Sequence, residues 1–252
     1  MTTAGADMSD TVADFVTDPG SGSDAGAAQP ADRPRWVRAF VAAGIALGLL
    51  LIGAAGGLML GGLGSTTPAV PAADSVDVGF AQDMTVHHQQ AVQMASWERD
   101  HTTDPQLKLL AADIEATQTG QIGRMQGWLE LWGAGALPVG GYMRWMADDP
   151  GHNAHGAPVT PDGGVAKMPG MASTAELNAL RAASGQQLDV LFLQLMLRHH
   201  EGGAGMLAYG AERAELPQVR NLARQMLTAQ TAESDYLRQL LAARGGTPLP
   251  MS

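Results

Sequence analysis

The chain has 252 residues, of which 45% are hydrophobic and 5% aromatic, and its net charge is -10. It contains no cysteine, which excludes disulfides, cysteine-based zinc sites and thiol catalysis. The acidic balance and the lack of a long Lys/Arg cluster argue against a nucleic-acid partner. Any metal site must therefore use His, Met or carboxylate side chains.

Residues 1–38 are rich in Gly, Ala, Ser and Asp and lack a periodic apolar pattern, which predicts a disordered tail. Residues 39–63 carry no charge and are long enough to cross a bilayer as one transmembrane helix. Arg33, Arg35 and Arg38 precede this run, so the positive-inside rule places the tail in the cytoplasm. We therefore expect a single-pass protein of the cell membrane with an extracytoplasmic C-terminal domain.

A cleaved signal peptide is the alternative, because Val70-Pro71-Ala72 resembles the small residues that precede a cleavage site. Both interpretations export the rest of the chain. Residues 64–76, rich in small residues and Pro, are then a linker.

The exported part contains an internal repeat. "FAQDMTVHHQQAVQM" begins at Phe80, and "FLQLMLRHHEGGAGM" begins 112 residues later at Phe192. The correspondence continues through Pro105 with Pro217 and Gly133 with Gly245, which indicates a duplication.

Each copy, residues 77–134 and 186–246, is predicted to be a helical hairpin, with Pro at the start and Gly after the end of its second helix. Two such hairpins can bury their apolar faces against each other, giving an all-α four-helix bundle over residues 77–246. A crossover over residues 135–185 joins them, mostly irregular because of its Gly and Pro content. Within it, Ser173 and Glu176 form a capping-box pattern that predicts a short helix.

The two His-His pairs are the residues that point to a chemical function. At helical spacing, each His-His pair shares one face with the Met residues around it. If the first hairpin turns near Thr103 and the second near Glu215, Gln118 stands level with His88, and Gln230 with His200, in an otherwise apolar stripe. Buried polar groups need partners, so the pairs are either core residues bonded to Gln118 and Gln230 or parts of a metal site. Four of seven His in two matching pairs favour the metal site.

The ligand types indicate copper. Imidazole suits several transition metals, whereas thioether sulfur selects copper, and Cu(I) in particular. The crossover adds further residues of the same types, which we treat as secondary metal candidates: Met143, Met146, His152, His155, Met168 and Met171. A di-iron enzyme would need Glu-x-x-His on two helices, and only Glu98 to His101 shows that spacing.

Three segments, "DMTVHHQQAVQMA" from Asp83, "MPGMAS" from Met168 and "FLQLMLRHHEGGAGML" from Phe192, resemble the bacterial family called domain of unknown function 305. The resemblance covers about residues 77–246 and implies a ferritin-like four-helix fold, export and, for some members, copper binding. The metal ligands that it implies are Met84, His87, His88, Met94, Met196, His199, His200 and Met206. This chain departs from the family pattern at Gly202, Gly203 and Gly205, which should loosen the second motif's helix.

We expect a membrane-anchored, extracytoplasmic protein that binds copper ions for buffering or sequestration and is not an enzyme. The alternatives are a metal-free helical interaction module and a ferritin-like metal-dependent oxidoreductase.

Overall fold

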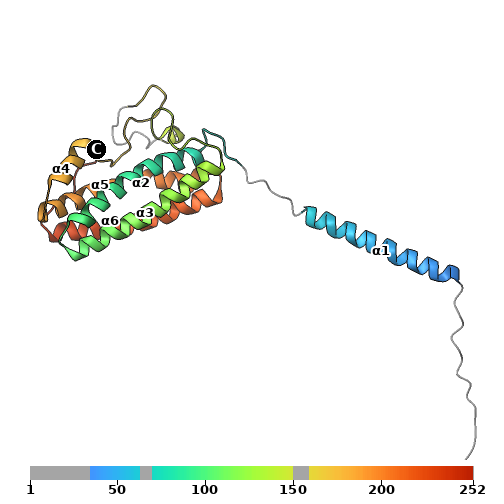
Figure 1. Ribbon diagram of the computed structural model, residues 1–252. Helices are drawn as coiled ribbons and strands as arrows, with labels where there is room; N and C mark the ends of the chain where they lie inside the picture. Colours follow the sequence, from blue (N-terminus) through green and yellow to red (C-terminus); the bar gives the residue numbers. More distant parts are fainter. Residues whose placement is uncertain (1–34, 63–69, 150–158, 252) are drawn as a thin grey trace, which may run out of the picture. The chain divides into compact units, whose positions relative to one another are not determined.

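The computed structural model describes residues 35–62, 70–149 and 159–251, and its named elements are all helical. They are α1 (Arg35–Gly62), α2 (Val76–His101), α3 (Pro105–Leu131), the 3-10 turn η1 (Arg144–Met146), α4 (Thr174–Ala182), α5 (Gln186–Arg213) and α6 (Pro217–Ala243). The prediction of an all-α chain is confirmed. Figure 1 shows α2, α3, α5 and α6 side by side, with the crossover and α4 laid along them.

The helix boundaries follow from local chemistry. Asp104 caps α3 by accepting hydrogen bonds from the backbone amides of the next turn, and Pro105 occupies the first helical position. Gly133 and Gly245 follow α3 and α6 with φ of 63° and 70°, a backbone conformation that favours glycine. The second helix of each hairpin therefore begins at its Pro and ends before its Gly, as the sequence predicts.

The two hairpins, α2–α3 and α5–α6, pack against each other through α2 and α5. These two helices run antiparallel, because the start of each contacts the turn that follows the other. Asp77 accepts hydrogen bonds of 2.9 Å from the amides of Glu215 and Leu216, and Asp189 accepts one of 2.7 Å from the Thr102 hydroxyl. Asp77 and Asp189 are equivalent positions in the repeat, so each hairpin ties down the turn of its partner.

The crossover is irregular but ordered by specific contacts. Its two strand-like contacts are isolated bridges from Val165 to Tyr142 and Val159. Ser173 and Glu176 form the predicted capping box at the start of α4. Arg198 of α5, 4% exposed, then donates two hydrogen bonds to Glu176, which fixes α4 on the second hairpin.

The predicted membrane span, residues 39–63, falls almost entirely within α1. Among the residues described, no helix combines the length and the apolar character needed to cross a membrane. Residues 1–34 and 63–69 lie outside the described ranges, and with them most of the predicted tail and part of the linker. The helix α1 and the C-terminal domain are separate units.

A buried histidine layer as candidate metal centre

Four histidines meet in the interior between the hairpins. His87 and His88 of α2 and His199 and His200 of α5 are each at most 1% exposed. The rings of His87 and His199 have centroids 3.8 Å apart and planes tilted by 33°, and His88 and His200 stand on the outer sides of this pair. The antiparallel packing of α2 and α5 therefore brings the two copies of the motif together at one level.

All four imidazoles use the same nitrogen for hydrogen bonding. Nε2 faces an oxygen in each case: the backbone carbonyl of Pro169 for His87, at 3.3 Å, and the backbone carbonyl of His87 for His199, at 3.0 Å. The outer pair uses side chains, with Nε2 of His88 2.8 Å from Oε1 of Gln121 and Nε2 of His200 2.9 Å from Oε2 of Glu233. Because these oxygens only accept, Nε2 carries the proton in every ring.

The other nitrogen of His87, His88 and His199 is left with a lone pair. Burial lowers the pKa of His87 to about 4 and, together with the charge of His87, that of His88 to about 3. Burial also holds the pKa of His199 well below its usual value. These three rings are therefore neutral at pH 7, and Nδ1 of all four is buried without a hydrogen-bond partner in the described chain. A protonated Nε2 held by an oxygen, with Nδ1 free, is the arrangement of a metal-binding histidine.

The hydrogen-bond partners that we expected for the outer histidines, His88 and His200, are wrong by about one helical turn. We predicted Gln118 opposite His88 and Gln230 opposite His200, whereas the structure pairs His88 with Gln121 and His200 with Glu233. Helical side chains tilt toward their own N-terminus, so tips in an antiparallel hairpin meet between residues whose Cα atoms are offset. Both amide atoms of Gln118 and Oε1 of Gln230 stay buried without a partner in the described residues, which adds unpaired polar atoms to this part of the core.

The motif methionines flank the histidine layer on both sides. All four are 0% exposed. Met84 and Met206 belong to one apolar cluster, and Met94 and Met196 belong to a second one. The eight predicted ligands thus do not converge on one point: the four His form the middle layer, and one Met pair lies toward each end.

The crossover methionines join the first of these clusters. Met143, Met146 and Met168 are buried with Met84 and Met206, and Met171 packs against them half-buried. Met125 of α3 and Met226 of α6 lie in the same cluster. The other two secondary candidates, His152 and His155, lie outside the described residues.

The Met-Pro-Gly-Met element of the crossover reaches the histidine layer through a close backbone contact. A Cβ on Gly202 would lie 2.4 Å from the carbonyl oxygen of Pro169, and a Cβ on Gly170 would lie 2.4 Å from that of Arg198. These two glycines let the crossover touch α5, which places the Pro169 carbonyl against His87. Gly202 is therefore explained by packing, whereas our sequence interpretation saw only a weaker helix.

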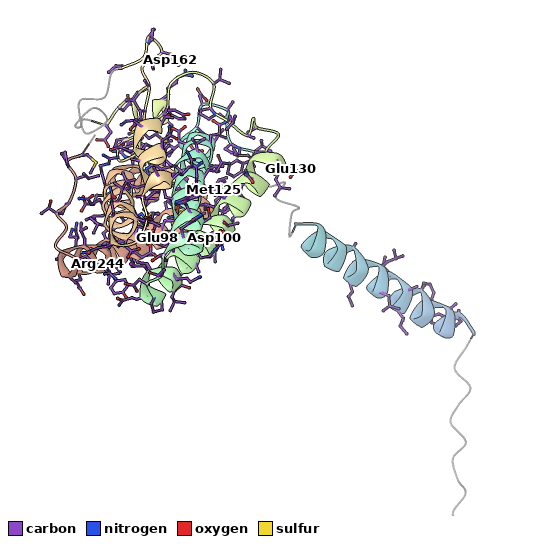
Figure 2. The ribbon with its side chains drawn as sticks, turned by 60° about the vertical axis from the view of Figure 1, so that its left-hand side comes forward. Glu98, Asp100, Met125, Glu130, Asp162 and Arg244 are labelled. Atoms are coloured by element: carbon purple, nitrogen blue, oxygen red, sulfur yellow. The ribbon has the colours of Figure 1, made fainter. Side chains whose placement is uncertain are left out.

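The Glu-x-x-His spacing of Glu98 and His101 lies at the end of α2, away from this layer. Glu98 is buried at the far end of α2, where burial and then the charge of Asp189 raise its pKa to about 8. His101 is exposed and its Nδ1 contacts the carbonyl of Trp97, so Glu98 and His101 do not form a di-iron ligand pair. Within the described ranges, no three His, Asp or Glu side chains gather closely enough to hold a metal ion. In Figure 2, Glu98 and Arg244 lie at the opposite end of the domain from Asp162 of the crossover.

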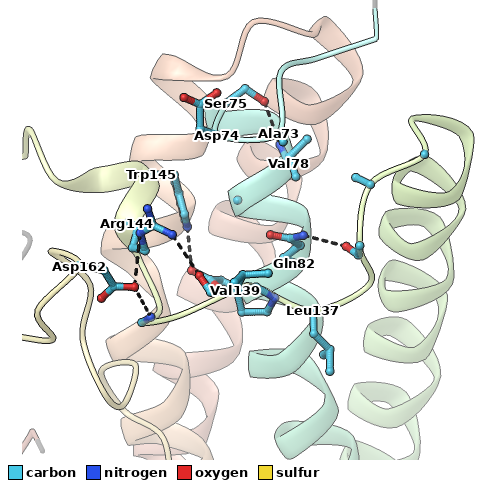
Figure 3. Close-up of a pocket in the computed structure, with 17 residues that line it drawn as sticks. Ala73, Asp74, Ser75, Val78, Gln82, Leu137, Val139, Arg144, Trp145 and Asp162 are labelled. Carbon is cyan, nitrogen blue, oxygen red and sulfur yellow. Dashed lines mark hydrogen bonds and ion pairs between the residues drawn. The ribbon is translucent and has the colours of Figure 1, made fainter.

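A cavity of about 520 Å³ lies at that crossover end, between the start of α2 and the chain that follows α3 (Figure 3). Asp83 is buried beside it and accepts hydrogen bonds from the Met143 amide and the Trp145 indole, at 2.6 and 2.8 Å. Burial raises the pKa of Asp83 to about 6, and these two hydrogen bonds oppose the rise. The carboxylate thus fastens the crossover onto α2, and the cavity is separate from the histidine layer.

Comparison with solved structures finds relatives that match the C-terminal domain. A DUF305 protein from Streptomyces coelicolor, described as secreted, is 40% identical with a TM-score of 0.62, over 71% of this chain and 99% of that one. A DUF305 fragment from Deinococcus radiodurans is 30% identical with a TM-score of 0.52, over 67% and 96% of the two chains. CopM in its Cu(I)-bound form is 25% identical with a TM-score of 0.50, over 68% and 98%.

The comparison with curated proteins finds no significant match. The family profile described as domain of unknown function (DUF305) matches residues 77–241, which include both His-His motifs and the crossover between them. The chain therefore belongs to the DUF305 family.

Proposed function

We propose that this protein binds copper, as Cu(I), in the histidine layer, and that it buffers or sequesters the ion outside the cytoplasm. The observation that carries the proposal is the shared state of four buried imidazoles. Each holds its Nε2 proton on an oxygen and keeps Nδ1 without a partner in the described chain. Burying four ring nitrogens without a partner is costly unless something binds them.

The surroundings favour copper over harder metals. No group of three His or carboxylate side chains is gathered in the described residues, so a ligand set would combine imidazole with thioether or amide groups. The motif ligands that we propose are Met84, His87, His88, Met94, Met196, His199, His200 and Met206, with Met143, Met146 and Met168 as buried neighbours of the first Met pair. Thioether ligands select Cu(I). The similarity to CopM, a structure with bound Cu(I), supports the same metal.

Export and anchoring complete the proposal. A relative described as secreted supports export, and anchoring through residues 39–63 rests on the uncharged run and the arginines before it. The ferritin-like four-helix description of residues 77–246 belongs to the same proposal. A reporter fused after Ser252 should be active only outside the cytoplasm, and cytoplasmic activity would contradict the proposed topology.

The decisive experiment replaces the two central histidines of the layer. We expect His87→Gln with His199→Gln to abolish Cu(I) binding by the full chain, measured anaerobically by competition with a chromophoric chelator. His101→Gln is the matched control, because His101 is exposed on the same helix and outside the layer. Full Cu(I) binding by the double variant would contradict the assignment. Lower thermal stability with no copper bound by the wild type would favour the metal-free interaction module.

A further inference from the structure

A second, smaller cavity opens between α5 and α6 at the level of the histidine layer. Its volume is about 200 Å³, and His200 and Gln230 are among its lining residues. Both belong to the buried polar layer described above: Nδ1 of His200 and Oε1 of Gln230 have no partner in the described chain. The cavity therefore reaches from the surface of the second hairpin to atoms of the candidate metal centre.

The inner end of this cavity leads toward the central histidines. A Cβ on Gly203 would lie 3.0 Å from Cε1 of His87 and 3.7 Å from Oε1 of Gln230. The absence of a side chain at Gly203 thus lets α5 pack closely against both His87 and Gln230. Gln230, which lines the cavity, and His87 are therefore neighbours of the same glycine.

At the outer end of this cavity, carboxylates surround the guanidinium of Arg238. Arg238 donates hydrogen bonds of 2.6 Å to Glu201 and 2.7 Å to Asp235, so its charge is neutralised by two acids. Glu233, which holds His200, adds a third carboxylate on the same helix as Arg238. Of these charged groups, Glu201 and Arg238 line the cavity itself, whereas Asp235 and Glu233 contact the lining residues Arg238 and His200.

The first repeat differs at the positions that form this cavity. Val92 stands where the second repeat has Ala204, and Ile122 stands where it has Ser234. Gln89 and Gln126 replace the charged Glu201 and Arg238. At these four positions the second repeat has the smaller or the charged residue, whereas Ala95 and Glu115 of the first repeat stand where the second has Leu207 and Leu227.

We propose that copper ions enter and leave the histidine layer through the cavity between α5 and α6, so that the second hairpin controls the rate of exchange. This inference rests on the proposed function. It assigns roles to Glu201, Ala204, Thr231 and Ser234 as residues of the entry route that do not themselves bind the ion at its final site.

The route can be blocked chemically, because the chain has no cysteine of its own. Thr231→Cys, alkylated with a bulky maleimide, places an obstacle on the exposed rim of the cavity. Thr119→Cys, alkylated in the same way, is the matched control, because Thr119 is the exposed equivalent residue of the first repeat. Cu(I) supplied anaerobically as its acetonitrile complex is mixed with each full-length adduct, and uptake is followed in time.

We expect the Thr231 adduct to take up Cu(I) about tenfold more slowly than the Thr119 adduct, a change in association rate within the usual range for one site. Both adducts should bind the same amount of Cu(I) at equilibrium. Equal uptake rates would overturn the route while leaving the binding site intact. Absence of Cu(I) at equilibrium in the unmodified chain would instead overturn the proposed function.

The same route can be tested without chemical modification, by placing residues of the first repeat at the equivalent positions of the second. Ala204→Val with Ser234→Ile should also slow uptake without changing the amount bound, whereas Val92→Leu with Ile122→Leu should leave the rate unchanged. Circular dichroism of both double variants verifies that the helices are intact. A slowing in both, or in neither, would contradict a route through the second hairpin.

Discussion

His199 donates a hydrogen bond from Nε2 to the backbone carbonyl of His87, its equivalent in the other repeat, and the centroids of the two rings lie 3.8 Å apart. The reverse contact is not made, because Nε2 of His87 instead faces the carbonyl of Pro169 in the crossover. The two copies of the motif are therefore related in sequence but not equivalent in space. The crossover breaks their symmetry at the centre of the candidate site.

The outer histidines differ in their acceptors, which makes the two halves chemically distinct. Replacing Glu233 by Gln keeps an acceptor oxygen for His200 but removes the negative charge that makes its imidazole a stronger ligand. We expect Cu(I) affinity to fall about tenfold in a chelator competition, which is typical for loss of such an outer partner. Gln121→Glu on the side of His88 is the reciprocal variant and should raise the affinity. Equal affinities for wild type and both variants would contradict a role for the outer histidines.

Replacing Gly202 or Gly205 of the second motif by Ala should change the free energy of unfolding in opposite directions. Gly202→Ala pushes a methyl group into the backbone of Pro169, so we expect the free energy of unfolding to fall by about 1–3 kcal/mol and Cu(I) binding to weaken. Gly205 is exposed and a Cβ there would contact nothing within 4 Å, so Gly205→Ala should raise the same free energy by about 1 kcal/mol through helix propensity. Urea unfolding of both variants tests this, and equal effects would contradict the close contact with the crossover.

Acid should destabilise the metal-free protein through its histidines. The unfolded chain protonates His87 and His88 near pH 6.5, whereas the folded chain keeps them neutral down to about pH 4 and 3. Their contribution to stability is therefore complete above pH 6.5 and is lost as the pH falls toward 4, by about 1.4 kcal/mol per pH unit for each His. Urea unfolding between pH 7 and 4 measures this slope. The variant with Gln at both positions should show a flatter profile, and an unchanged slope would argue that these rings are not held neutral.

Glu98 should make the stability of the fold depend on pH in the opposite direction. Its pKa is raised to about 8 by burial and then by Asp189, so the folded chain retains a proton that the unfolded chain releases near pH 4.5. The resulting stability is complete below pH 4.5 and is lost as the pH rises to 8. Glu98→Gln should abolish this loss and stabilise the protein at pH 8, while Glu130→Gln, on the exposed face of α3, should not. Urea unfolding at pH 5 and 8 distinguishes them, and matching profiles would mean that Glu98 is ionised in the fold.

The sequence by itself determined the helical elements and their ends. Local interactions set these features: Asp104 and Pro105 begin α3, Gly133 ends it, and Ser173 with Glu176 begins α4. The repeat also predicted that His87 and His88 would lie on the same kind of buried face as His199 and His200, because helical periodicity is a property of the chain alone.

Only the tertiary structure decided what those histidines contact. The antiparallel packing of α2 on α5 sets His199 against His87, and side-chain tilt across each hairpin selects Gln121 and Glu233 in place of Gln118 and Gln230. The role of the crossover was equally hidden, because Gly170 and Gly202 lie 32 residues apart in the sequence and meet only when the chain folds back onto α5. Such contacts depend on distances between segments that no local pattern encodes, and they decide which nitrogen of each imidazole is left to bind an ion.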